Sequence, residues 1–249
     1  MTSRFIDLNA DMGEYADDAQ RASEAALMPL ISSCSVACGG HAGDATTMRE
    51  TLRLAKVHNV SIGAHPAYPD REGFGRRHLE FDADILASSI HDQIAALEEI
   101  AAAENVSLRH VKPHGALYND AAKDIDLASI IARTAKEYIL VGQPGSALEQ
   151  AARDEKLAFA PEGFVDRAYQ ASGALTPRSV PGAIIADIDA RAEQALAIAR
   201  SDTIQTNDGV LSLKVKTLCI HSDSPGAVET ARAARRMLKK NDFSIRAFE

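Results

Sequence analysis

The sequence predicts a single β/α barrel, and two patterns carry this prediction. Predicted strands and helices alternate around seven times along the 249 residues, which is typical of parallel strands joined by helical crossovers. Polar clusters follow the carboxyl ends of many of these strands, as in a barrel whose loops assemble one site. An open, doubly wound sheet would gather them near one switch point. We therefore expect one α/β domain over residues 1–249, a distorted TIM-like barrel of about seven parallel strands.

The individual elements follow from hydrophobic periodicity and from end signals. Strands are predicted over residues 4–11, 32–37, 60–64, 108–112, 138–142, 157–160 and 216–220, with a further short strand over 243–248. Helices are predicted over residues 23–30, 125–136 and 186–201, after the N-cap residue Asp44, from Asp82, from Ser146, and after an N-cap and N1 pair at Ser224 and Pro225. The Gly-, Pro- and Ser-rich segment 172–182 is predicted to be a long loop.

Strand periodicity places polar side chains on one face of several strands. In the first strand Asp7, Asn9 and Asp11 alternate with aliphatic residues, so they share a face. Three other strands present polar or small residues in the same way: Ser61, Gly63 and His65; His110, Lys112 and His114; and Thr217, Cys219 and His221. Four such strands indicate a barrel with a polar mouth. Burying ionisable groups is costly unless they pair, bind an ion or hold a substrate.

Composition limits the possible partners. The formal charge is -8 and the chain has no long basic run, so nucleic acid and anionic membranes are not expected to bind. No run of 18 apolar residues and no apolar leader is present, so we expect a soluble, cytoplasmic protein. The sparse cysteines Cys34, Cys38 and Cys219 are expected to be reduced thiols. Neither a phosphate-binding Gly-x-x-x-x-Gly-Lys-Ser/Thr nor a GxGxxG motif occurs.

The stretch from Ser61 to Arg77 is the most informative part of the chain. Its strand stops at His65-Pro66 and is followed by a loop that is much longer than the usual βα connection of about 2–6 residues. The loop uses glycine and proline to hold charged side chains beside a strand end, which is typical of a functional loop. An ordinary connection with a capping histidine is the alternative.

The strand-end clusters supply two sets of candidate site residues. The candidate catalytic residues are Asp11, His41, His65, Lys112 and His114. The candidate substrate-binding residues are Asn9, Asp44, Arg76, Arg77, Glu162, Asp166, Arg167, His221 and Asp223. A purely structural role stays open for several of them: Glu162, Asp166 and Arg167 can form an internal ion pair, and Asp223 can be a turn residue.

Six sequence blocks together resemble the LamB/YcsF family. They are Asp7-Leu-Asn-Ala-Asp-Met-Gly-Glu14, Ala37-Cys-Gly-Gly-His-Ala-Gly-Asp44, Gly63-Ala-His-Pro66, Gly73-Phe-Gly-Arg-Arg77, Val111-Lys-Pro-His-Gly-Ala-Leu-Tyr-Asn119 and Asp166-Arg-Ala-Tyr169. The resemblance spans the chain from about residue 7 to residue 238. It implies a seven-stranded barrel of the glycoside hydrolase/deacetylase group.

The resemblance also implies an activity, the opening of 5-oxo-L-proline to L-glutamate coupled to hydrolysis of ATP, with Mg²⁺ and two other 5-oxoprolinase subunits. An unstrained lactam is a poor electrophile, so ATP would activate it, and water would then add to a C=N-like centre. This chemistry needs a base for water, a cation for oxyanion charge and an anchor for the substrate carboxylate. Asp11, His41 or His65 could be the base. Lys112 could be the cation, and Arg76 or Arg77 the anchor.

Two other functions stay open. One is a metal-dependent C–N hydrolase, deacetylase-like, in which Asp11, His41 and His65 ligate a transition metal. The other is a binding subunit that delivers 5-oxoproline to a partner that holds the catalytic groups.

The pair Lys112 and His114 has a further expected property. Pro113 between them favours an extended backbone, so both side chains point the same way from one strand end. Two cationic groups in this position should repel each other, which would lower the pKa of His114 or of Lys112.

Overall fold

The computed structural model describes residues 4–248 and shows a closed barrel of parallel strands. The strand order is β1-β2-β3-β4-β5-β6-β9, and β9 also pairs with β1, which closes the barrel. The predicted barrel of seven parallel strands is therefore confirmed. Its strands are β1 (Arg4–Met12), β2 (Ser33–Ala37), β3 (Ser61–His65), β4 (Leu108–Val111), β5 (Ile139–Gly142), β6 (Phe159–Phe164) and β9 (Thr217–Cys219). A short strand β10 (Phe243–Ile245) pairs with the start of β1 outside the ring.

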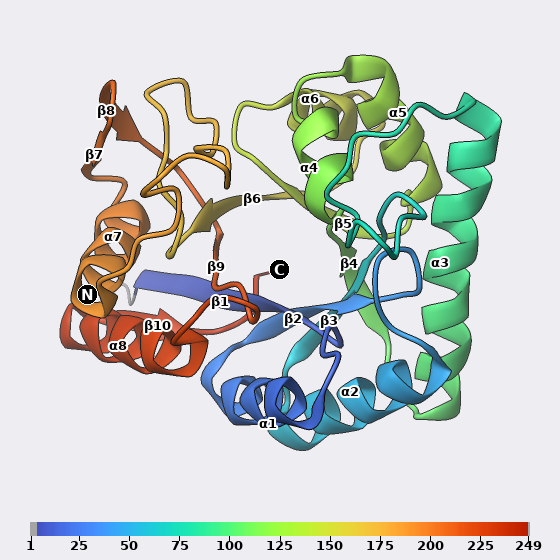
Figure 1. Ribbon diagram of the computed structural model, residues 1–249, viewed down its shortest axis with the longest axis horizontal. Coiled ribbons are helices and arrows are strands. Elements are labelled where there is room, and N and C mark those ends of the chain that lie inside the picture. Colours follow the sequence, from blue (N-terminus) through green and yellow to red (C-terminus); the bar gives the residue numbers. More distant parts are fainter. Residues whose placement is uncertain (1–3, 249) are drawn as a thin grey trace.

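Helices lie around the outside of the ring of strands (Figure 1). They are α1 (Asp18–Leu27), α2 (Ala45–His58), α3 (Ala83–Ala103), α4 (Gly115–Ala121), α5 (Ile125–Thr134), α6 (Ala147–Asp154), α7 (Ile188–Arg200) and α8 (Ala227–Lys240), with a 3₁₀ turn η1 (Met28–Leu30) after α1. The predicted cap of α2 is confirmed, because the Asp44 side chain accepts hydrogen bonds from backbone N–H groups of the first turn. Asp82 and Ser146, where two further helices were predicted to open, cap α3 and α6 in the same way.

The structure differs locally from the predictions. Helix α1 begins at Asp18 and not at residue 23, and residues 28–30 form the 3₁₀ turn η1. Helix α4 follows β4 where only a loop was expected, since its seven residues are too few to show a helical period. The hairpin β7 (Thr203–Thr206) and β8 (Gly209–Ser212) was not anticipated. Strand β6 continues to Phe164 instead of ending at residue 160, because Pro161 is accommodated in the ladder. Gly226, not Ser224, is the N-cap of α8, and the Ser224 hydroxyl donates to Asp166 instead.

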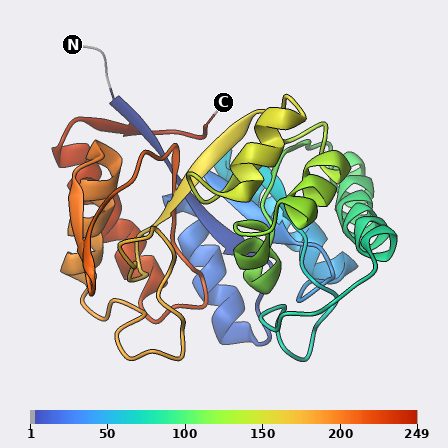
Figure 2. The same cartoon turned by 90° about the horizontal axis from the view of Figure 1, so that it is seen from above.

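The two ends of the barrel differ. The strand β1 points toward the end where the long loops lie (Figure 2). At the opposite end Phe248 packs with Val141 and Ala160, and its ring meets that of His110 edge-on at 5.2 Å. This apolar contact fills the end of the barrel where the strands begin. The other end is left for polar side chains.

One layer of the barrel interior depends on a glycine. Residues Ser35, Gly63 and His110 are register partners on β2, β3 and β4, and the Ser35 hydroxyl is 3.2 Å from His110 Nε2. A Cβ atom on Gly63 would lie 2.2 Å from His110 Cδ2. His110 is 1% exposed, so its ring has no free space to enter. The small residue at 63 thus makes room for the buried imidazole.

We predict that Gly63→Ala destabilises the fold by about 1–3 kcal/mol through overpacking. In a His110→Ala background the same change should cost much less, because the clashing ring is gone. Urea unfolding of the two single variants and the double variant gives the coupling free energy. Additive effects of the two substitutions would contradict the proposed contact.

Candidate active site

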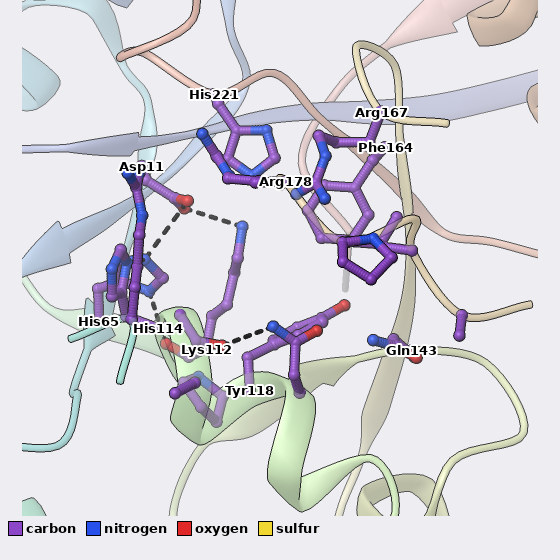
Figure 3. Close-up of a pocket in the computed structure, with 18 of the residues that line it drawn as sticks. Asp11, His65, Lys112, His114, Tyr118, Gln143, Phe164, Arg167, Arg178 and His221 are labelled. Carbon is purple, nitrogen blue, oxygen red and sulfur yellow. Dashed lines mark hydrogen bonds and ion pairs between the residues drawn. The ribbon is translucent and has the colours of Figure 1, made fainter. Parts of the chain in front are cut away.

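The polar strand ends converge on one pocket of about 360 Å³ at the carboxyl end of the barrel (Figure 3). The predicted convergence of Asp11, His65, His114 and His221 is confirmed, since all four line this pocket. Its other polar lining residues come from the strand ends and from the loops around them: Glu14, Arg76, Lys112, Tyr118, Asn119, Lys123, Gln143, Arg167, Thr176, Arg178 and Asp223.

The Lys112 ammonium group lies at the base of the pocket. It follows β4 directly and is 2% exposed. Its Nζ is 2.8 Å from Asp11 Oδ1 and 2.8 Å from Glu162 Oε1, and it donates to Asn9 Oδ1 at 3.3 Å. The Phe164 ring lies 5.7 Å from Nζ. One cation therefore joins β1, β6 and the end of β4.

The charges at Lys112 overturn one expectation. Burial alone would lower the pKa of Lys112, but Asp11 and the other negative neighbours outweigh burial and raise it well above its ordinary value. A lowered pKa for Lys112, one of the two outcomes expected from repulsion by His114, is therefore wrong. Burial would raise the pKa of Asp11, yet the charges of His65 and Lys112 hold it well below its ordinary range. The pair is an ammonium and a carboxylate near neutral pH.

Beside Lys112 lies a cluster of three histidines and Glu14. Glu14 Oε1 is 2.7 Å from His41 Nε2, 3.2 Å from His114 Nδ1 and 3.7 Å from His65 Nε2. The His41 and His114 rings stack at 3.6 Å between centroids, with 2° between their planes. Burial, and then the nearby His114, lower the pKa of His41 to about 4, so His41 is neutral at pH 7. Such a group of carboxylate and imidazole donors has the composition of a metal site.

The loop between β3 and α3 holds this cluster from outside. Phe74 and Gly75 have φ values of 53° and 62°, and this turn brings the Phe74 carbonyl oxygen to 3.0 Å from His114 Nε2. A Cβ atom on Gly75 would approach His41 Cβ to 2.9 Å. The glycine is thus required both by the backbone conformation and by the packing against His41.

The opposite wall of the pocket is cationic. Arg76 forms an ion pair with Asp223, and Arg178 Nη1 is 3.6 Å from the same carboxylate. Arg167 is 6% exposed and donates to the carbonyl oxygens of Thr176 and Ala183. Burial, together with the neighbouring Arg178, lowers the pKa of Arg167. Three guanidinium groups line this wall, and two of them share one carboxylate, so the wall suits an anionic group of a ligand.

A second buried carboxylate orients His221. Asp166 is fully buried and accepts from His221 Nδ1 at 2.9 Å and from the Ser224 hydroxyl at 2.6 Å. Burial would raise the pKa of Asp166, but the charge of His221 and these hydrogen bonds lower it to about 2. The His221 ring also stacks on Phe164 at 5.2 Å. The imidazole is thereby fixed at the edge of the pocket.

The structure separates the predicted site residues into three groups. Those that line the pocket are Asp11, His65, Arg76, Lys112, His114, Arg167, His221 and Asp223. Those that lie behind it and hold the lining residues are Asn9, His41, Glu162 and Asp166. The remaining two are outside: Asp44 caps α2 and is exposed, and Arg77 pairs with Asp70.

Sequence reasoning missed Glu14 and Arg178 as site residues. Glu14 lies two residues beyond the end of β1, so the strand alternation that singled out Asp11 does not reach it. Arg178 belongs to the loop after β6, where no periodic signal exists. The one signal for Glu14 was its place in the block Asp7-Leu-Asn-Ala-Asp-Met-Gly-Glu14.

The cysteines are free thiols, as expected. Burial raises the pKa of Cys38 to about 12, with only partial opposition from backbone hydrogen bonds, so Cys38 is not a thiolate near neutral pH. Cys219 Sγ accepts from Lys112 Nζ at 3.2 Å and lies inside the barrel wall.

Among the described residues, 4–248, no helix is both long and apolar enough to cross a membrane.

Comparisons with known proteins agree with this architecture. A protein from Bordetella parapertussis, named as the A subunit of 5-oxoprolinase, is 43% identical over 247 residues, which are 97% of this chain and 98% of the relative. The protein of the same name from Pyrococcus furiosus is 42% identical over 245 residues, 96% of each chain.

Among solved structures, the lactam utilization protein from Thermus thermophilus is 40% identical with a TM-score of 0.89, covering 98% of this chain and 100% of that one. A deacetylase solved with its substrate is 12% identical with a TM-score of 0.52, covering 98% of this chain and 87% of that one, and it shares the fold alone. The sequence profile of the LamB/YcsF family matches residues 6–249. The chain therefore belongs to the LamB/YcsF family.

Proposed function

We propose that this chain is the A subunit of an ATP-dependent 5-oxoprolinase, a cytoplasmic enzyme that opens 5-oxo-L-proline to L-glutamate together with two other subunits. The names of the relatives support the lactam substrate. The observation that carries the proposal is the two-sided pocket. One wall presents Lys112 between two carboxylates, and the other presents three arginines, two of which pair with Asp223. A small cyclic amide that bears a carboxylate would fit both walls, with its amide carbonyl at Lys112 and its carboxylate at the arginines.

The lactam end would lie at Lys112 and Asp11. The amide carbonyl of an unstrained ring is a poor electrophile, so the γ-phosphoryl group of MgATP is transferred to the lactam oxygen and ADP leaves. Water then adds to the ring carbon, the C–N bond breaks, and the nitrogen takes up a proton. A second water hydrolyses the resulting acyl phosphate to the carboxylate and phosphate. Lys112 stabilises the developing negative charge on oxygen, and the ionised Asp11 takes the proton from water.

The substrate carboxylate would lie at the arginine wall. Arg76 and Arg178 share Asp223 as their counter-ion, so they keep hydrogen-bonding capacity toward the pocket. Arg167 has its guanidinium group fixed by two backbone carbonyls. Charge-assisted hydrogen bonds from such a group position the ring without entering the chemical step. Of the two arginines first considered as the anchor, Arg76 lines the pocket and Arg77 does not.

A second candidate function is metal-dependent C–N hydrolysis without ATP. The group of Glu14, His41, His65 and His114 favours it, because their ligand atoms lie within 4.8 Å of one another. Glutamate formation from 5-oxoproline without any nucleotide, lost after treatment with a chelator, would select this function over the ATP-dependent one.

We expect the purified chain alone to form almost no glutamate from 5-oxoproline, even with ATP and Mg²⁺. The sequence contains no recognisable phosphate-cradling loop, so the phosphoryl transfer requires the other subunits. Chromatographic measurement of glutamate and ADP, with and without the two partner subunits, checks this. Rapid ATP-dependent turnover by this chain alone would show that phosphoryl transfer does not require the other subunits.

We predict that Lys112→Met lowers kcat of the reconstituted complex by about 10²–10³-fold, as for loss of one oxyanion partner. The same change leaves Glu162 without its counter-ion and Asp11 with His65 alone, and it should cost about 3–5 kcal/mol of stability. The double variant Lys112→Met/Glu162→Gln removes one unpaired charge. It should regain part of the stability but none of the turnover, which separates catalysis from folding.

The control for Lys112 is Lys136→Met, since Lys136 is exposed on the loop before β5, at the far end of the barrel. Thermal unfolding and steady-state kinetics are measured on all three variants. Normal kcat in the double variant would place the chemistry elsewhere.

We expect Arg178→Gln to raise KM for 5-oxoproline by about 10–100-fold with little change in kcat, since one charge-assisted hydrogen bond is worth about 1.5–3 kcal/mol. Arg77→Gln, which alters an arginine outside the pocket, is the matched control and should leave both parameters near those of the parent. If Arg178→Gln raises KM for ATP and leaves that for 5-oxoproline unchanged, the arginine wall binds phosphate and the substrate assignment fails.

A further inference from the structure

Three ligand atoms meet beside the pocket. His65 Nε2 is 3.0 Å from His114 Nδ1, His114 Nδ1 is 3.2 Å from Glu14 Oε1, and His65 Nε2 is 3.7 Å from Glu14 Oε1. All three side chains are buried yet line the pocket. Figure 3 shows His65 and His114 together at the Asp11 side of the pocket.

The outer nitrogens of both rings determine where the hydrogens are. His65 Nδ1 lies 2.7 Å from the Lys112 carbonyl oxygen, and His114 Nε2 lies 3.0 Å from the Phe74 carbonyl oxygen. A carbonyl oxygen only accepts, so each of these nitrogens carries a hydrogen. In the neutral rings, His65 Nε2 and His114 Nδ1 are then both lone pairs. They face each other and a carboxylate oxygen, and this arrangement is repulsive unless a positive charge lies between them, either a proton shared by the two nitrogens or a metal ion.

His41 lies in the same cluster but is not placed as a metal ligand. Its Nε2 is 2.7 Å from Glu14 Oε1, whereas its Nδ1 is buried and has no hydrogen-bond partner among the described residues. A hydrogen on Nε2 satisfies Glu14 and leaves only a lone pair unpaired. Because the His41 and His114 planes are parallel and stacked, their in-plane lone pairs cannot both point at one ion. His41 therefore orients Glu14, as an outer partner of a metal ligand does.

The spacing and the charge of this group fit a divalent transition metal. Ligands at about 2.0–2.1 Å around a tetrahedral zinc ion are about 3.3–3.4 Å apart, and the observed separations of 3.0, 3.2 and 3.7 Å bracket that value. Asp11 and Glu162 pair with the ammonium of Lys112, and Glu14 lies beside the imidazoles of His65 and His114. Three carboxylates thus accompany one ammonium, so the cluster favours a further positive charge. Nitrogen donors favour zinc over magnesium.

We propose that Glu14, His65 and His114 bind one zinc-class ion with an open position toward the pocket. Asp11 Oδ2, 3.4 Å from His65 Nε2, lies beside that position. This set replaces the Asp11, His41 and His65 set considered from the sequence, because the stacked His41 cannot share an ion with His114. A bound ion of this kind polarises an oxygen or lowers the pKa of a bound water. The proposal concerns this chain alone and does not depend on ATP or on partner subunits.

The test loads chelator-treated chain with Zn²⁺ or Co²⁺, with Mg²⁺ as the negative control. Elemental analysis after gel filtration should give about one zinc per parent chain, and Co²⁺ should give visible absorption typical of tetrahedral ligation. Zn²⁺ should raise Tm of the parent chain. His114→Gln and Glu14→Gln should lose the bound ion. His41→Gln should retain it with affinity lowered about 10–100-fold.

The matched control is His78→Gln, since His78 is exposed and pairs with Asp120 outside the cluster. Circular dichroism of the metal-free chains shows whether each variant is folded. If the parent chain binds no zinc, the proposal is wrong, and a proton shared by His65 Nε2 and His114 Nδ1 accounts for their 3.0 Å separation. Zinc retained in His114→Gln but lost in His41→Gln would refute this ligand set. One ion per chain with no 5-oxoproline turnover in the complete complex would uphold the site and refute the proposed function.

Discussion

The site depends on the buried ammonium of Lys112. Its contacts with Asp11 and Glu162, both at 2.8 Å, hold together the ends of β1, β4 and β6. Each of these charges would be expensive to bury alone, by several kcal/mol, and each is tolerated because the others compensate it. Asn9 completes the network by donating to Glu162 and accepting from Lys112. The negative charge that gathers Lys112 here also creates the environment of His65 and His114.

The loops around the Lys112 network form the two walls of the pocket. The turn at Phe74 and Gly75 reaches over the barrel end and fixes the outer nitrogen of His114 with a backbone carbonyl. The next residue, Arg76, lies on the other wall through its ion pair with Asp223. A single loop therefore contributes to both walls, and Gly75 permits the close approach of its backbone to His41 and His114.

Much of the fold and part of the site could be predicted from local pattern. Alternation along β1 identified Asp11, because each inward side chain is separated from the next by one residue. The same rule could not identify Glu14, which lies past the strand end and reaches the cluster through a turn at Gly13 with a φ of 76°. Helix α4 and the hairpin β7–β8 escaped prediction because each is too short to show a period.

The sequence by itself determined the class of fold, the polarity of the barrel and the residue types at its mouth, since these follow from periodicity and from the order of strand, loop and helix. The tertiary structure alone decided which side chains meet. Arg76 and Arg77 are neighbours in the chain, yet one lines the pocket and the other pairs with Asp70 outside it. His41 and His114 are far apart in the chain and stack at 3.6 Å. Such contacts depend on barrel closure and loop conformation, which no local pattern encodes.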